Sequence, residues 1–106
     1  MNQHIRDLTT RFRHGLESIY QSRLKGIYLF GSYARGEADP ESDVDLLVVL
    51  DHFDQYGAEV DRTSALGAEL SLAHAVSISE VFVSEHDWLT RRTPFLNSVR
   101  REAVHV

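Results

Sequence analysis

The chain contains 106 residues, of which 42% are hydrophobic, and its formal net charge is −5 at pH 7. This length and composition predict a single domain over residues 1–106 that can form its own core. The negative charge argues against nucleic acid as a direct ligand, and the lack of cysteine excludes disulfides and thiolate metal sites. No segment resembles a signal peptide or a membrane span, so we expect no membrane contact and a cytoplasmic location.

Three elements are predicted in the first half of the chain. Residues 26–30, GIYLF, are typical of a short buried strand, and residues 43–50, DVDLLVVL, predict a second strand with apolar contacts on both faces. The first twenty residues predict an amphipathic helix, because apolar side chains recur at steps of three and four residues. These side chains are Ile5, Leu8, Phe12, Leu16 and Ile19.

The second half adds a helix, a strand and two short helices. Residues 76–83 predict a third strand, followed by a helix capped by Ser84 and a last helix with Thr93 as N-cap and Pro94 at its first position. Before them, residues 56–74 predict a helix whose apolar stripe consists of Tyr56, Val60, Thr63, Leu66, Leu70 and Ala73. This order of elements predicts one α+β domain.

A glycine-containing loop follows the first strand. Gly31 and Gly36 have the spacing of a P-loop, but Glu and Ala come next, where that motif requires Lys and Ser or Thr. A different phosphate cradle fits better. Gly31 allows close backbone approach, and Ser32 opens a helical turn with its N–H groups and hydroxyl toward an anion. Arg35 either adds charge there or pairs with an acid. The alternative is an ordinary turn capped by Ser32.

Two carboxylates, Asp43 and Asp45, open the second strand. Residues at i and i+2 of a strand project from the same face, so the two anions repel each other and lose hydration at the core edge. Mg²⁺ would neutralise them, since it takes one or two carboxylates plus substrate phosphates. Ser42 is expected to hold one carboxylate or the loop. The alternative is that Asp43 ends the loop and Asp45 alone lies in the strand, facing solvent.

Together these residues resemble the G-S-x-A-R-G…S-D-x-D-L signature of the nucleotidyltransferase superfamily with the DNA polymerase β-like fold. The matching segments are residues 31–36 and 42–46. The short chain is similar to the minimal nucleotidyltransferases (MNT), which include MntA-type antitoxins. The resemblance implies a small mixed β-sheet flanked by helices and a Mg²⁺-dependent transfer of a nucleotidyl group, AMP from ATP, to a hydroxyl.

The resemblance also implies roles for single residues. In such enzymes magnesium bridges the carboxylates and the triphosphate, the glycine-serine turn holds the β- and γ-phosphates, and a hydroxyl attacks the α-phosphate. Asp43 and Asp45 are therefore expected to be catalytic metal ligands. The nucleotide-binding residues expected from the same signature are Gly31, Ser32, Arg35 and Ser42.

A third carboxylate usually stands on a neighbouring strand in this superfamily, where it binds the catalytic metal. Glu80 is the only acid within residues 76–83, so we expect Glu80 to be this catalytic metal ligand. It departs from the usual aspartate by one methylene. The alternative is that Glu80 is a solvent-facing residue of an edge strand.

The resemblance further implies a partner. Minimal nucleotidyltransferases often pair with a small helical HEPN ribonuclease, and some are antitoxins that adenylylate a tyrosine of this toxin. We therefore expect ATP and a HEPN-type protein as partners. The alternative is a binding module that has kept the fold, lost the chemistry, and neutralises or regulates its partner by contact alone.

Overall fold

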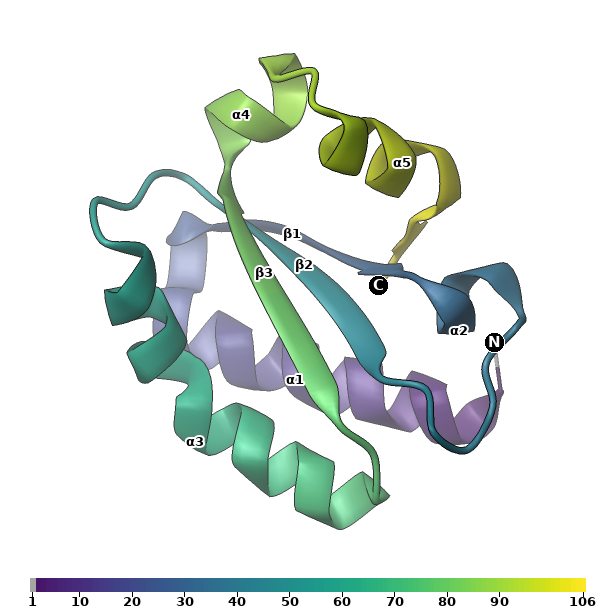
Figure 1. Ribbon diagram of the computed structural model, residues 1–106. Helices are drawn as coiled ribbons and strands as arrows, with labels where there is room; N and C mark the ends of the chain where they lie inside the picture. Colours follow the sequence, from purple (N-terminus) through teal and green to yellow (C-terminus); the bar gives the residue numbers. More distant parts are fainter. Residues whose placement is uncertain (1) are drawn as a thin grey trace.

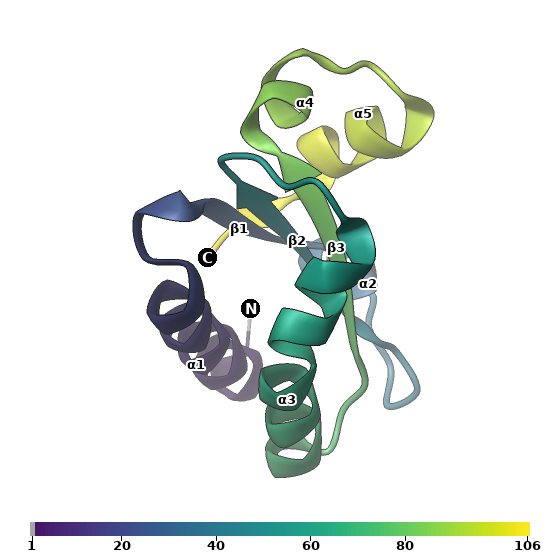
Figure 2. The ribbon, with the colours of Figure 1, turned by 90° about the vertical axis from the view of Figure 1, so that its left-hand side faces the viewer.

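The computed structural model describes residues 2–106 and arranges them in three layers, with a β-sheet in the middle (Figures 1 and 2). Helices α1 (Gln3–Tyr20) and α3 (Tyr56–His74) cover one face of the sheet. Helices α4 (Glu85–Thr90) and α5 (Pro94–Glu102) lie over the other face. The remaining elements are η1 (Gln21–Arg23), β1 (Leu24–Phe30), α2 (Ser32–Arg35), β2 (Val44–Leu50), β3 (Ile78–Ser84) and β4 (Val104–His105).

The sheet is mixed and has the strand order β3-β2-β1-β4. Strand β1 runs antiparallel to β2 and to β4, whereas β2 and β3 run parallel and are connected through α3. The α+β fold with a small mixed sheet flanked by helices is therefore confirmed, and the predicted elements occur in the predicted order. The sequence did not predict η1 or the two-residue strand β4.

Strand β2 is buried on both faces, which explains its nearly continuous apolar sequence. Leu46 and Val48 belong to the larger core, together with residues of α1 and α3. Leu47 and Val49 point into a smaller core with residues of α5. Because side chains alternate along a strand, Asp45 lies on the same face as Leu47 and Val49, the face that carries α4 and α5.

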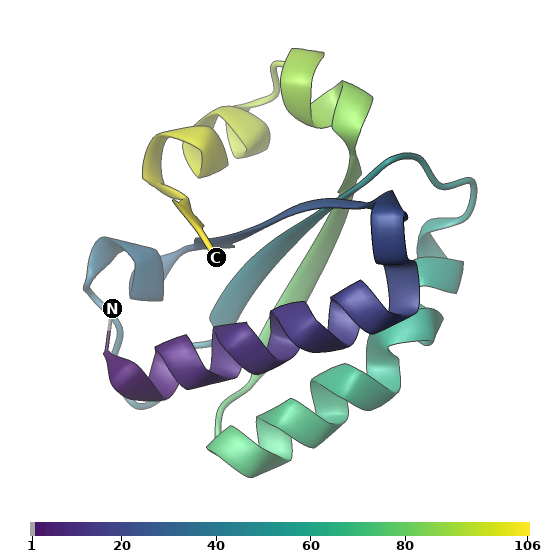
Figure 3. The same ribbon diagram turned by 180° about the vertical axis from the view of Figure 1, so that it is seen from behind.

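The packing of α1 follows the predicted stripe, with one change at its end. Ile19 is 37% exposed, and Tyr20 is buried in its place, four residues after Leu16. Helix α1 packs beside α3 over the back of the sheet (Figure 3). Part of the stripe predicted for α3 is wrong, because Tyr56, Val60 and Ala73 are exposed. The buried residues of α3 are Glu59, Thr63, Leu70 and His74.

Glu59 is the buried residue at the start of α3, where apolar side chains were predicted. Its Oε1 accepts a hydrogen bond of 2.7 Å from the Tyr20 hydroxyl and one of 3.1 Å from Arg62 Nε. Burial and the bond to Glu59 raise the pKa of Tyr20 strongly, so the phenol stays protonated. A buried carboxylate is tolerated when it is hydrogen-bonded and paired in this way.

Both predicted helix caps near the C-terminus are present. The Ser84 hydroxyl accepts from the Asp87 N–H at 3.2 Å, and the Thr93 hydroxyl accepts from the Leu96 N–H at 3.1 Å. Pro94 takes the first position of α5. Within residues 2–106, no helix has the length and apolar character needed to cross a bilayer.

Candidate functional site

The turn after β1 is built on two glycines with positive φ. Gly31 has φ 76° and ψ −158°, and Gly36 ends α2 with φ 72° and ψ 24°. The Gly31 carbonyl accepts from the N–H groups of Ala34 and Arg35, each at 3.1 Å. Ser32 is the first residue of the resulting helical turn, as the sequence predicts.

Gly31 also touches one of the two predicted metal ligands. A Cβ atom on Gly31 would collide with Oδ2 of Asp45, so no other residue fits here without movement of that carboxylate. The contact follows from the sheet, because Phe30 of β1 is paired with Asp45 of β2. The glycine-serine turn and the second carboxylate are thus side by side.

The two aspartates lie at the entrance of β2. Asp43 is exposed in the last position before the strand, as in the alternative considered above, but Asp45 is partly buried and does not simply face solvent. Burial raises the pKa of Asp45, and the neighbouring Asp43 carboxylate raises it further, while the Arg35 guanidinium lowers it. The Glu102 carboxylate, the smallest of these influences, also raises this pKa, so Asp45 has two other negative charges and one cation nearby.

These residues fit a magnesium ion. Asp45 is partly buried against Gly31, and the exposed Asp43 carboxylate is close enough to raise its pKa, so the entrance of β2 offers oxygen donors from two neighbouring carboxylates. Such donors suit Mg²⁺, which commonly completes its coordination with substrate phosphates and water. No group of three or more potential His, Asp or Glu ligands is found among residues 2–106. The carboxylates that would hold the ion here are those of Asp43 and Asp45.

Glu80 does not join this site, which corrects the expectation of a third carboxylate. The parallel register pairs Asp45 with Ser79 and Leu46 with Glu80, so Glu80 projects from the opposite face. There its Oε2 accepts a hydrogen bond of 3.1 Å from Thr63 of α3. Its Oε1 is buried without a partner among the described residues, and burial raises the pKa of Glu80. Glu80 is thus neither beside the aspartates nor a solvent-facing edge residue.

Ser79 occupies the β3 position beside Asp45 instead. A serine hydroxyl is neutral, so it supplies no third negative charge. The alternation of side chains along β3 is visible in the sequence, but its register against β2 is not. That register is set by backbone bonds, including one of 2.8 Å from the Val44 N–H to the Ser77 carbonyl.

Arg35 lies at the end of the turn and is paired with two acids. Its Nε donates to Glu37 Oε2 at 3.1 Å, and its Nη1 donates to Glu102 Oε2 at 3.0 Å. The other oxygen of Glu102, Oε1, accepts from the Gly31 N–H at 3.0 Å. Sequence reasoning missed Glu102, because it lies 67 residues after Arg35 and belongs to no motif of the turn.

The structure favours a loop role for Ser42. Its hydroxyl accepts from the Asp39 N–H at 3.0 Å and lies 3.3 Å from Asp39 Oδ1. These bonds close the short loop that delivers Asp43 to the start of β2. A hollow of about 390 Å³ borders Ser42 and Asp43 on the side of α3.

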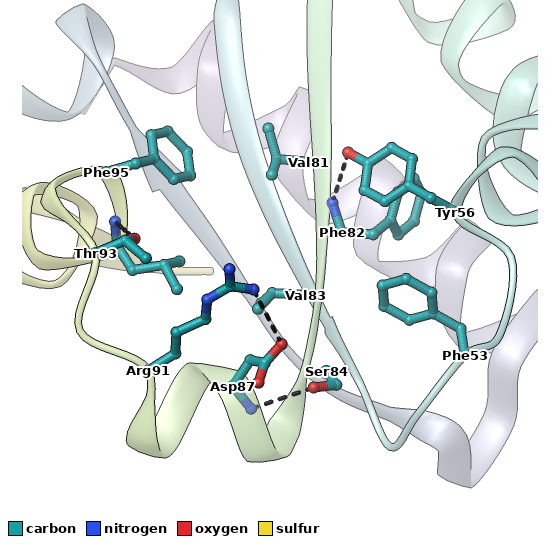
Figure 4. Close-up of a pocket in the computed structure, with 11 residues that line it drawn as sticks. Phe53, Tyr56, Val81, Phe82, Val83, Ser84, Asp87, Arg91, Thr93 and Phe95 are labelled. Atoms are coloured by element: carbon teal, nitrogen blue, oxygen red, sulfur yellow. Dashed lines mark hydrogen bonds and ion pairs between the residues drawn. The ribbon is translucent and has the colours of Figure 1, made fainter.

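A second hollow, of about 480 Å³, runs along β3 (Figure 4). Phe53 and Tyr56 line one side of it, and Phe95 of α5 lines the other. Its floor includes Val81 and Val83, which alternate with Ser79 and therefore share the sheet face of Asp45. None of the predicted site residues lines this hollow.

Comparison with known proteins places these features in a family. Residues 10–98 match the family described as Nucleotidyltransferase domain. Two relatives from Methanocaldococcus jannaschii bear the name Putative protein adenylyltransferase. MJ0141 is 29% identical over 94% of this chain and 96% of its own. MJ0604 is 40% identical, and the match covers 70% of this chain and 68% of the length of MJ0604.

Solved structures share the fold. One described as a "putative minimal nucleotidyltransferase" is 27% identical, with a TM-score of 0.59 over 95% of this chain and 94% of its own. A toxin–antitoxin structure with AMP-PNP is 21% identical in sequence, with a TM-score of 0.62. The match covers 89% of this chain and 68% of that chain. The structure of a tri-AMPylated Shewanella oneidensis HEPN toxin in complex with MNT antitoxin is 17% identical in sequence, with a TM-score of 0.53. The match covers 92% of this chain and 70% of that chain.

Proposed function

The chain belongs to the nucleotidyltransferase domain family, and we propose that it transfers AMP from ATP, with Mg²⁺, to a hydroxyl of a partner protein. The predicted family and the DNA polymerase β-like fold are confirmed, and the chain is a minimal nucleotidyltransferase related to MntA antitoxins and protein adenylyltransferases. The closeness of Gly31 and Asp45 supports the finer proposal, because it brings the turn that we expect to bind phosphate next to a carboxylate that we expect to bind metal.

In this proposal each side of the site has its own task. Asp43 and Asp45 would hold Mg²⁺, which when bound would supply positive charge against the triphosphate and the reacting oxygens. The N–H and hydroxyl of Ser32, with the Arg35 guanidinium, bind the β- and γ-phosphates. Gly31 keeps the turn close enough to Asp45 for both tasks to act on one triphosphate.

The proposed acceptor is a hydroxyl on a HEPN-type toxin. Support comes from the relatives named as protein adenylyltransferases and from the AMPylated HEPN toxin bound to an MNT antitoxin. In this role the chain acts as the antitoxin. We further propose that residues 1–106 form one nucleotidyltransferase domain and that it works in the cytoplasm.

A second candidate function is a module that regulates its partner by contact alone. One observation favours it: Ser79 stands beside Asp45, where enzymes of this superfamily usually place a third carboxylate. Without that charge the site holds metal more weakly and lacks a base for the attacking hydroxyl.

Incubation with ATP labelled at the α-phosphate, Mg²⁺ and the purified product of the neighbouring gene distinguishes the two functions. The control is the double variant Asp43→Asn/Asp45→Asn. The enzyme proposal expects label on the partner with the parent protein and none with the variant. Absence of label with both forms, together with equal partner binding by both, would leave the contact-only module.

A further inference from the structure

Glu102, the last residue of α5, connects both ends of the phosphate turn. Its Oε1 accepts from the Gly31 N–H at 3.0 Å, and its Oε2 accepts from Arg35 Nη1 at 3.0 Å. One carboxylate from the C-terminal helix thus contacts the residue before α2 and the residue that ends it. Neither bond is local, since the partners are 71 and 67 residues away.

The segment that carries Glu102 is itself fixed on both sides. Before it, Arg100 Nη2 donates to the carbonyls of Trp88 at 2.6 Å and Arg91 at 2.7 Å, which ties α5 to α4. After it, β4 pairs with Tyr28 and Leu29 of β1, immediately before the turn. Because the backbone is held at both ends, the Glu102 carboxylate has a defined place from which to orient the turn.

The hydrogen bonds to Glu102 occupy some N–H donors of the turn and of Arg35 and leave others for a ligand. The Gly31 N–H is directed to Glu102, so the anion-binding N–H groups of the turn begin with Ser32. Arg35 has five N–H groups, of which Glu102 and Glu37 receive one each. Other donors of its guanidinium stay available to a phosphate. The pKa of Glu102 is held below its ordinary value, first by the Gly31 N–H and then by Arg35, so the carboxylate is ionised at neutral pH.

We propose that Glu102 is a positioning residue of the nucleotide site, which fixes the Gly31 peptide against Asp45 and aims Arg35 at the triphosphate. This inference rests on the proposed function, because it assigns Arg35 to the phosphates. It makes the C-terminal helix part of the site, although α5 contributes no ligand of its own.

The variant Glu102→Gln tests the proposal, with Glu37→Gln as a matched control. Gly31 and Arg35 donate to different oxygens of Glu102, and glutamine replaces one of these oxygens with an NH₂ group that only donates, so both bonds cannot be kept in this geometry. Glu37→Gln removes the same charge from beside Arg35 but leaves Gly31 untouched. We expect Glu102→Gln to weaken Mg²⁺–ATP binding about tenfold, the factor for one lost hydrogen bond to a charged group. For Glu37→Gln we expect less than about a threefold change, as for an exposed ion pair.

A third variant, Glu102→Asp, separates geometry from charge. It keeps the charge, but its shorter side chain cannot span Gly31 and Arg35 together, so positioning predicts weakened binding here too. Unchanged binding by Glu102→Asp, or equal losses in Glu102→Gln and Glu37→Gln, would reduce Glu102 to a charge near Arg35 and overturn the proposal. Tighter binding by Glu102→Gln would overturn it as well, since Glu102 would then compete with the triphosphate.

The Gly31 amide gives a readout that needs no nucleotide. In the ¹H–¹⁵N spectrum of the free protein, its proton should move upfield in Glu102→Gln and stay in place in Glu37→Gln. If the parent protein binds no nucleotide, the proposed function fails, and this signal still decides whether Glu102 fixes the turn. An unmoved Gly31 amide in Glu102→Gln would show that the bond does not control the turn.

Discussion

Glu80 is the residue at which local sequence pattern and fold disagree most clearly. It lies under α3, with Thr63 as the hydrogen-bond partner of one oxygen and no partner for the other among the described residues. Burial disfavours the ionised form more than the Thr63 hydrogen bond favours it, which is why the pKa of Glu80 is raised. A carboxylate in this position costs stability whenever it is charged.

The variant Glu80→Gln should therefore be more stable than the parent at neutral pH. Because the folded-state pKa lies above the unfolded one, the parent has its full stability at low pH and loses part of it as pH rises through the folded pKa. The neutral amide does not pay this cost. Thermal denaturation at pH 7 should give a higher Tm for the variant, and the difference should vanish near about pH 4, where glutamic acid protonates. A variant less stable than the parent at both pH values would contradict this.

At the scale of elements, the register of β3 against β2 decides which side chains reach the site. The strand itself, the helix caps and the turn at Gly31 follow from local patterns, because spacing and residue type carry that information. Whether Ser79 or Glu80 faces Asp45 depends on one step of register, and such a step moves every side chain to the other face. The sequence therefore predicts strand β3 correctly, but it does not show that Ser79, and not Glu80, lies beside Asp45.

Two further differences have the same origin in tertiary context. Glu59 is buried at the start of α3, where apolar spacing pointed to Tyr56 and Val60. Its non-local partner is Tyr20, which lies 39 residues away in the sequence, and Arg62, one turn later on α3, adds a second hydrogen bond. Strand β4 is too short to show a period, and it exists through its pairing with β1. In contrast, Asp43 and Asp45 can be recognised from the sequence, because charged residues are unusual at the start of an otherwise apolar strand.

The register makes Ser79→Asp a direct test of the site's metal chemistry. An aspartate there would project beside Asp45, on the same sheet face. Without metal, a third adjacent anion should lower Tm. With Mg²⁺, the variant should gain more Tm than the parent, because an added carboxylate strengthens the site. Ser79→Asn adds an oxygen without the charge and should show neither effect. An Mg²⁺ response equal to that of the parent would mean that Ser79 does not face the metal position.

At the scale of the whole molecule, the site and the stability of the fold are linked through charge. Asp43 and Asp45 are two of 16 acidic residues in a chain of net charge −5, and they stand close together at the start of the central strand β2. The raised pKa of Asp45 means that its ionisation at neutral pH opposes folding. The apo protein thus carries an electrostatic cost at this point, which a bound cation would reduce.

Thermal denaturation with Mg²⁺ and a non-hydrolysable ATP analogue measures this link. Ligand at 100 times its Kd stabilises the folded state by about 2.7 kcal/mol, which in a domain of this size raises Tm by roughly 10 °C or more. The variant Asp43→Asn/Asp45→Asn should lose this rise and yet be more stable than the parent without ligand, because the repulsion is gone. A variant that is less stable without ligand would assign the two aspartates to holding the fold and not to binding. Loss of the rise together with a gain in apo stability is the combination expected only of residues kept for a ligand.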